Sequence, residues 1–209
     1  MSAQRGYHHG DLKEALLAAA LESIAREGTE RLSLRALARE AGVSPTAPYR
    51  HFPTKNCLLA ALMTRGFRDL QTQLLAAAEA QDPEERFVQV GLAYVRFALG
   101  NPTSYNLMFS PVVGDFTNYP ELGLAAAESY DVVLNSLEAL RVQERVPGLT
   151  LSAAGGVAWS AVHGLSSVLL FGRGRGSSTA GPRSPLASLI ALEQQVDDAL
   201  RLLLRGLLG

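Results

Sequence analysis

Apolar side chains recur at steps of three and four residues through most of the chain, which is the period of an α-helix with one buried face. The first such run covers residues 11–27 and stops at Gly28. A shorter run over residues 33–41 stops at Gly42, and a third, over residues 45–52, follows after a two-residue turn. Because glycine commonly terminates helices, the pattern predicts three helices separated by tight turns.

The rest of the chain continues this pattern between breaks rich in proline, glycine and asparagine. No segment has the strict alternation of a β-strand, and the sequence contains no internal repeat. The sequence therefore predicts an all-α fold of about nine helices. The six that follow the first three are expected over residues 54–79, 83–100, 104–109, 121–145, 151–171 and 186–208.

Composition agrees with a packed helical protein. Hydrophobic residues make up 47% of the chain and aromatic residues only 7%, so alanine and leucine supply most of the core. The single Cys57 excludes an intramolecular disulfide, and no Cys and His cluster has zinc-site spacing, so we expect neither metal nor cofactor. Residues 1–17 lack the pattern of a secretory signal, which makes the cytoplasm the expected location.

One stretch without Asp, Glu, Lys or Arg, between Arg145 and Arg173, is long enough to cross a membrane. It contains Pro147, His163 and several serine and glycine residues, and so many polar groups are costly to place in lipid. We therefore expect a buried helix of a soluble protein and no membrane partner. A membrane span is the alternative.

The formal net charge of −1 hides an asymmetry along the chain. Residues 1–70 carry 10 Lys and Arg against 7 Asp and Glu, whereas the remainder carries 9 against 13. A mildly basic N-terminal part on an acidic body is typical of a DNA-reading module joined to a second domain. A difference of this size supports a nucleic-acid partner only together with a motif.

Two short helices joined by a glycine-containing turn, with longer helices on either side, form the helix-turn-helix pattern. The second short helix enters the major groove, where Thr46 and Arg50 would share one face and Ala47 would meet a thymine methyl. Taken singly, Tyr49 is as well explained as a core aromatic and Arg50 as a solvated charge, but the ordered set favours DNA binding. The candidate DNA-contacting residues, several of them phosphate donors at helix starts, are Ser33, Arg35, Ser44, Thr46, Ala47, Tyr49, Arg50, His51, Thr54 and Lys55.

The same segment carries a family resemblance. Residues 34–55 read LRALAREAGVSPTAPYRHFPTK and resemble the DNA-binding signature of TetR-family regulators, with its alanine-rich helix, AGVS turn and YxHF ending. The resemblance implies a homodimer that binds a pseudo-palindromic double-stranded operator, usually as a repressor released by a small-molecule effector. Two further segments, RGYHHGDL and AWSAVHGL, are similar to a subgroup named WHG for Trp, His and Gly, here Trp159, His163 and Gly164.

The expected domains are a helix-turn-helix DNA-binding domain over residues 1–55 and a ligand-binding and dimerisation domain over residues 56–209, with the helix from about residue 54 as connector. Pro48 departs from the family pattern, in which leucine is common, and removes one amide from the reading helix. Two interpretations remain open for the segment from Arg5 to His9, either an arm that enters a DNA groove or a frayed terminus.

The last helix has an apolar stripe opposite a charged side. Together with the uncharged helix over residues 151–171, in which Gly155 and Gly156 permit close approach, it would form a four-helix dimer interface, as the resemblance also implies. An interior role within one chain is the alternative, because a stripe does not identify its partner. The candidate interface residues are Leu189, Leu192, Val196, Leu200 and Leu203.

Ligand pockets in helical domains lie between helices and are mostly apolar with a few polar anchors. Any single aromatic residue is more often core than pocket, so the set is a hypothesis about a region. The candidate pocket residues are Tyr94, Phe97, Tyr105, Met108, Phe109, Phe116, Trp159 and His163.

An enzyme is disfavoured because residues 172–176, GRGRG, follow no strand and lack phosphate-loop spacing, and no nucleophile elbow or HExxH helix is present, so no catalytic residue is expected. A helical interaction module of the same fold without specific DNA binding stays possible in view of Pro48. Salt-sensitive DNA binding separates it from a regulator.

Overall fold

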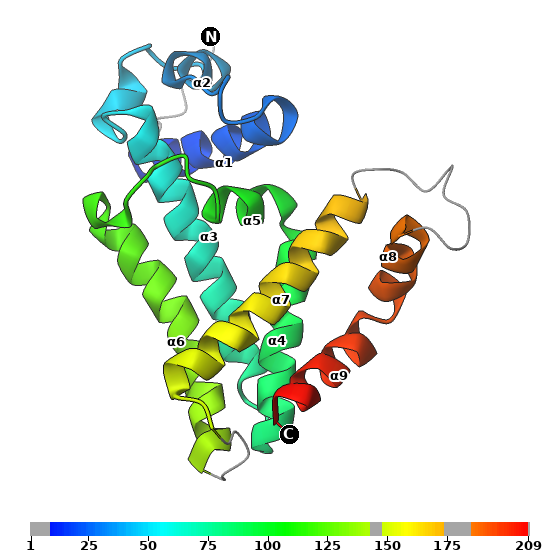
Figure 1. The fold of residues 1–209 in the computed structure, drawn as a ribbon. Helices are drawn as coiled ribbons and strands as arrows, with labels where there is room; N and C mark the ends of the chain where they lie inside the picture. Colours follow the sequence, from blue (N-terminus) through cyan, green and yellow to red (C-terminus); the bar gives the residue numbers. More distant parts are fainter. Residues whose placement is uncertain (1–8, 143–147, 174–184, 209) are drawn as a thin grey trace. The chain divides into compact units, whose positions relative to one another are not determined.

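A computed structural model describes residues 9–142, 148–173 and 185–208 of the chain (Figure 1). Within these residues all regular structure is helical and no strand is present, which confirms the predicted all-α fold. The elements of the described residues are α1 (His9–Glu27), α2 (Leu34–Glu40), the 3₁₀ helix η1 (Ala47–Arg50), α3 (Lys55–Ala77), α4 (Pro83–Gly100), α5 (Pro102–Met108), the 3₁₀ helix η2 (Phe116–Asn118), α6 (Pro120–Val142), α7 (Leu151–Arg173), α8 (Pro185–Gln194) and α9 (Val196–Leu208).

The last helix differs from the prediction of one continuous element over residues 186–208. It breaks at Gln195, whose amide donates to the carbonyl of Leu192 at 3.2 Å, three residues earlier. Asp197 and Asp198 then lie in the first turn of α9, where carboxylates favour a new helix N-terminus. α8 and α9 are therefore separate helices with separate packing.

The glycines that were expected to end the first two helices do so. Gly28 has a φ of +80° and Gly42 a φ of +66°, a backbone conformation that costs glycine little and other residues more. After α2 the amide of Val43 donates to the carbonyl of Ala38 at 3.0 Å, which closes the helix end over the left-handed glycine. This turn sets the position of η1 after α2.

The chain forms two compact units. Unit 1 consists of the described residues up to Gly66 together with Thr103–Leu124, and unit 2 consists of Phe67–Pro102 and the described residues from Ala125 onward. Unit 1 takes in α5 because α5 packs on α3, where a Cβ on Gly66 would lie 2.6 Å from Sδ of Met108. The functional division near residue 55 stays a prediction.

The core of unit 1 joins the three helices of its N-terminal part. Leu16 of α1, Leu37 of α2 and Leu58 of α3 are almost completely buried, and Phe52, directly after η1, joins them. Each such side chain stabilises the fold by about 1.5–3 kcal/mol relative to an exposed position. The buried inner faces of α2 and η1 leave their outer faces free for a partner.

Unit 2 is built around α4, against which α7 and α9 pack (Figure 1). Gly91 of α4 allows this approach, because a Cβ there would lie 3.0 Å from Leu204 and 3.3 Å from Leu200 of α9. Gly155 has the same role between α7 and α6, since a Cβ there would lie 2.5 Å from a methyl of Leu134. The close approach expected of Gly155 is thus made within the subunit, while the space at Gly156 is open.

Among the described residues, α7 alone is long and apolar enough to cross a membrane by length and composition. Its row of buried residues packs within unit 2 and includes the polar Ser166, whose hydroxyl donates to the carbonyl of Val162 at 2.7 Å. A core helix of a folded protein passes the same length and composition test. The row consists of Ala154, Gly155, Ala158, Val162, Leu165, Ser166 and Leu169.

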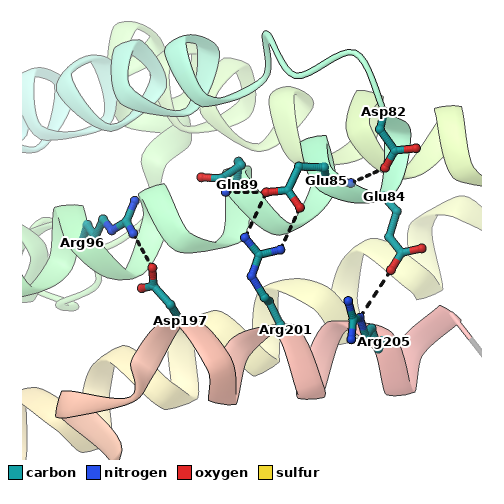
Figure 2. A network of polar contacts seen from close by, with 8 residues as sticks. All are labelled: Asp82, Glu84, Glu85, Gln89, Arg96, Asp197, Arg201 and Arg205. Atoms are coloured by element: carbon teal, nitrogen blue, oxygen red, sulfur yellow. Dashed lines mark hydrogen bonds and ion pairs between the residues drawn. The ribbon is translucent and has the colours of Figure 1, made fainter.

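A line of ion pairs joins α4 to α9 (Figure 2). The guanidinium of Arg201 binds both carboxylate oxygens of Glu85, at 2.7 and 3.0 Å, and Arg96 binds Asp197 at 2.6 Å. Gln89 also donates to Glu85, and these donors, Arg201 above all, lower the pKa of the Glu85 carboxyl to about 2. Part of the charged side of the last helix therefore faces α4.

Candidate functional site

The reading helix of the helix-turn-helix is η1, a 3₁₀ helix in place of the helix expected over residues 45–52. Its amides bond to carbonyls three residues earlier, with Tyr49 donating to Thr46 at 3.3 Å and His51 donating to Pro48 at 3.0 Å. Pro48 has no amide to donate to the carbonyl four residues earlier, as an α-helix requires, and it is buried. Proline therefore accounts for the tighter helix.

This geometry changes which side chains align along the reading helix. In a 3₁₀ helix residues three apart lie above one another, so Arg50 follows Ala47 and Tyr49 follows Thr46. The expected alignment of Thr46 with Arg50, four residues apart, belongs to an α-helix and is wrong here. Within the described part of the chain, Arg50 has no ion-pair or hydrogen-bond partner, so its guanidinium is available to a phosphate or a base.

The predicted DNA-contacting residues of α2 and η1 lie largely on the surface, on elements that contact each other. Ser33 and Arg35 are exposed at the start of α2, and the hydroxyl of Ser33 makes no capping bond. Tyr49 is 41% exposed although it is aromatic, which excludes the core interpretation of that residue. Ala47 and His51 are half-buried, whereas Ser44, Thr46 and Arg50 are exposed.

Four candidates already have structural partners. The hydroxyl of Thr54 accepts the amide of Cys57 at 3.1 Å and thereby caps α3. The ammonium of Lys55 donates to the carbonyl of Glu30 at 3.1 Å, which ties α3 to the loop before α2. The hydroxyls of Ser44 and Thr46 lie 3.3 Å apart. The sequence pattern did not indicate the Lys55 bond, because its acceptor is a main-chain carbonyl far along the chain.

The predicted N-terminal arm lies mostly outside the described residues. Arg5, Tyr7 and His8 precede them, and α1 begins at His9. Both interpretations of the arm therefore stay predictions.

In unit 2, the structure brings three of the predicted pocket residues together. The hydroxyl of Tyr94 on α4 lies 3.0 Å from Nδ1 of His163 on α7, and the ring of Trp159 stacks on the imidazole with centroids 4.9 Å apart. Burial lowers the pKa of His163, which favours the neutral imidazole. Phe97 is buried in the same unit. This cluster supplies polar groups beside an apolar interior.

A small apolar cavity lies beside this cluster within unit 2. Its volume is about 10 Å³, close to the room needed for one water molecule. At this volume the cavity has no room for an organic ligand. Its lining residues are Phe87, Val90, Gly91, Tyr94, Val133, Ala158, Val162 and Leu204.

The other four predicted pocket residues belong to unit 1. Tyr105 and Met108 of α5 are buried, and the ring of Phe109 meets that of Tyr105 edge to face with centroids 5.1 Å apart. Phe116 is half-buried in η2. The predicted pocket set is therefore divided between the two units.

The predicted dimer-interface residues differ in how far they are buried within the subunit. Leu200 is fully buried against α4 and belongs to the subunit's own core, which corrects its assignment to an interface. Leu189 lies against Gly172 of α7, and Leu192 and Val196 are half-buried. Leu203 is 47% exposed and fits an interface. The sequence pattern missed the more exposed Leu202, which lies outside the regular stripe.

Two short helices with buried inner faces, joined at a left-handed glycine and presenting hydroxyl, aromatic and basic side chains outward, define a helix-turn-helix DNA-binding protein. Two family profiles match the chain. One, described as "Bacterial regulatory proteins, tetR family", covers residues 16–62, and the other, described as "Tetracyclin repressor-like, C-terminal domain", covers residues 87–203. The chain belongs to the tetR family and is a DNA-binding transcriptional regulator of that family. The WHG subgroup stays a prediction.

Individual relatives agree with this assignment. The chain is 29% identical over 96 residues to the HTH-type transcriptional regulator YobS of Bacillus subtilis, a match that spans 46% of this chain and half of that protein. It is 26% identical over 153 residues to the HTH-type transcriptional regulator Rv0681 of Mycobacterium tuberculosis, which covers 73% of this chain and 67% of that protein. A solved structure of a protein of unknown function from Rhodococcus sp. RHA1 is 29% identical, with a TM-score of 0.74 over 99% of this chain and all of that one.

Proposed function

We propose that the protein is a cytoplasmic repressor that binds a pseudo-palindromic operator as a homodimer and leaves it when a small, largely apolar or aromatic effector binds. The observation that carries the DNA-binding part is the exposed set on α2 and η1, above all Arg50, which has no partner in the described residues. An unpaired guanidinium on a reading helix suits guanine edges or phosphates.

The proposed dimer uses the outward faces of α7 and α9. The exposed side of α7 carries no charged residue before its last turn and includes Val157, Val168 and Phe171, the last 56% exposed. Leu202 and Leu203 are exposed on α9, on the side that the ion pairs with α4 leave free. Large apolar side chains at the surface mark an interaction site. Two copies of these helices would form a four-helix interface, with the two reading heads set for half-sites about 34–36 Å apart or a multiple of that spacing.

The proposed effector region is the cluster of Tyr94, Trp159 and His163 with the adjoining apolar cavity. A ligand that enlarges this cavity must displace at least one of α4, α6, α7 and α9, since all four helices line it. Release of the operator then requires that the effector bind the DNA-incompetent arrangement more tightly. The polar anchors suit a ligand with one hydrogen-bonding group on an apolar or aromatic body.

The test is a fluorescence anisotropy titration of the whole protein against its own upstream intergenic DNA at two salt concentrations. We expect saturable binding that weakens with salt, and a loss of about 5- to 150-fold in the Arg50→Ala variant, the cost of one base contact. Arg141→Ala is the matched control, because it removes one positive charge whose ion pair with Glu138 is local to α6. If a folded dimer binds this DNA no better than unrelated DNA, or binds no DNA, the result would instead favour an interaction module without specific DNA binding.

A further inference from the structure

Unit 1 contains an open cleft of about 270 Å³ between the N-terminal half of α3 and the start of α6. The volume lies just below the range of about 300–1,000 Å³ typical of small-molecule pockets, so it suits a small ligand. None of the residues assigned above to the effector region lines it. Its lining residues are Lys13, His51, Phe52, Cys57, Ala60, Ala61, Thr64, Asn118, Tyr119, Pro120, Glu121 and Leu122.

Part of the lining is apolar. Phe52, Ala60 and Leu122 are nearly completely buried. Ala61 is half-buried beside them. These three side chains therefore lie beneath the cleft, and the apolar surface open to a small molecule comes from Ala61 together with Tyr119 and Pro120.

Most other polar groups of the cleft are already engaged. The hydroxyl of Thr64 donates to the carbonyl of Ala60 at 2.8 Å, and the side-chain amide of Asn118 donates to the carbonyl of Asp115 at 3.3 Å. Glu121 also has an interaction partner. These groups offer little further hydrogen bonding to a ligand.

Lys13 and His51 are different. Within the described residues neither side chain has a hydrogen-bond or ion-pair partner, and the His51 ring only lies tilted against that of Phe52, with centroids 6.4 Å apart. An ammonium is a donor with no acceptor capacity, and an imidazole nitrogen can also donate. The hydroxyl of Tyr119, which also lines the cleft, is likewise without a hydrogen-bond partner in the described residues and can donate too. The unengaged polar groups of the cleft therefore match an acid.

We propose that this cleft is a second ligand site, which binds a small amphipathic organic acid with its apolar body against Ala61, Tyr119 and Pro120 and its carboxylate toward Lys13 and His51. The consequence for DNA rests on the proposed function. Phe52 and His51 both donate their amides to the carbonyl of Pro48 in η1, at 2.9 and 3.0 Å, so the ligand contacts the end of the reading helix. A carboxylate at this position repels operator phosphates and so lowers the affinity for the operator. By thermodynamic linkage, the bound operator lowers the affinity for the acid by the same factor.

The test is a titration of the whole, DNA-free protein, labelled at alanine and leucine methyls, followed by NMR. The probes are 4-methylbenzoate, 4-methylbenzylamine and 4-methylbenzyl alcohol, which share one body and differ in the polar group. We expect the acid to shift the methyls of Ala60, Ala61 and Leu122, and the amine and alcohol to bind at least about fivefold more weakly. Lys13→Gln should weaken the acid by a similar factor, and Arg31→Gln, an exposed charge outside the cleft, should not.

No methyl shift with the acid at millimolar concentration, or equal binding of the amine, overturns the site as proposed. Because DNA is absent from this titration, its result does not depend on whether the protein is a repressor. A second titration, with operator DNA, then tests the coupling. Operator binding that is weaker at saturating 4-methylbenzoate supports the coupling, provided that the acid no longer weakens operator binding in the Lys13→Gln variant. Unchanged operator affinity with the cleft occupied overturns the coupling and leaves the site standing.

Discussion

The hydroxyl of Tyr94 and Nδ1 of His163, 69 positions apart in the sequence, meet at 3.0 Å between α4 and α7. The stacked ring of Trp159 covers the imidazole, whose pKa is lowered by burial. The contact therefore joins a tyrosine hydroxyl to a histidine that is neutral near pH 7. It links two helices that both line the closed cavity proposed to enlarge around an effector.

Removing the Tyr94 hydroxyl should destabilise the protein modestly. Tyr94→Phe keeps the buried ring and leaves Nδ1 of His163 without this partner, which costs about 1 kcal/mol. For a chain of this length we expect Tm to fall by about 2–4 °C in differential scanning calorimetry. Tyr119→Phe is the control, because its hydroxyl has no hydrogen-bond partner in the described residues. Equal Tm values for both variants would contradict the prediction.

The lowered pKa of His163 predicts a loss of stability in mild acid. Its ordinary pKa is 6.5, and the folded value is lower because burial disfavours the imidazolium. As pH falls below 6.5, the unfolded chain binds a proton first, so the free energy of unfolding decreases until the folded pKa is passed. Urea titrations at a series of pH values measure this. In the His163→Gln variant the free energy of unfolding should lose this part of its pH dependence. If the difference in unfolding free energy between wild type and variant stays constant across the pH range, the assignment to His163 is refuted.

Glu85 predicts a second, more acidic transition. Its pKa is lowered from 4.5 to about 2, chiefly by the hydrogen bonds from Arg201, so its stabilising effect is complete above 4.5 and is lost as pH falls toward 2. Because the pair is partly exposed to solvent, which screens the interaction, Glu85→Gln should lower Tm at pH 7 by only about 1–3 °C. Its Tm should vary less with pH in that acidic range than the wild type. Glu128→Gln, a carboxylate without an ion pair in the described residues, should follow the wild-type curve.

Pro48 predicts an effect on sequence preference rather than on affinity alone. Pro48→Ala restores an amide that can donate four residues back, so the reading helix can become α-helical and Arg50 changes its direction relative to Ala47. Selection from a randomised DNA pool should yield a different preferred half-site for the variant. An identical preferred sequence, with the variant folded, would show that the 3₁₀ geometry does not set readout.

The dimer proposal predicts that a charge on the outward face of α9 separates the subunits. Leu203→Glu should convert the dimer to a monomer in light scattering and weaken operator binding by about 100-fold or more, since each head then binds alone. Leu75→Glu on α3, where the leucine is also exposed, should leave the mass unchanged. A dimer that persists in Leu203→Glu would place the interface elsewhere.

Helix positions and the DNA-reading segment were predictable from the sequence, because the signals that carry them are local. The spacing of apolar residues marks the buried face of a helix. Gly28 and Gly42 end α1 and α2 because glycine adopts the positive φ of those turns with less strain than a residue that has a Cβ. The tetR-family assignment followed from one continuous segment. The tighter reading helix also has a local cause, because Pro48 has no amide to donate to the carbonyl four residues earlier.

Tertiary structure decided the contacts that join distant segments. Leu200 and Leu203 belong to one apolar stripe, yet Leu200 packs toward Gly91 of α4 while Leu203 faces solvent. The face that α9 turns toward α4 carries the buried Leu200 and Leu204 and is flanked by ion pairs with α4, and periodicity within one helix contains no information about a partner helix. The sequence by itself determined most of the helices and the family, whereas the break at Gln195, the faces that are buried and the faces that stay exposed depended on long-range packing.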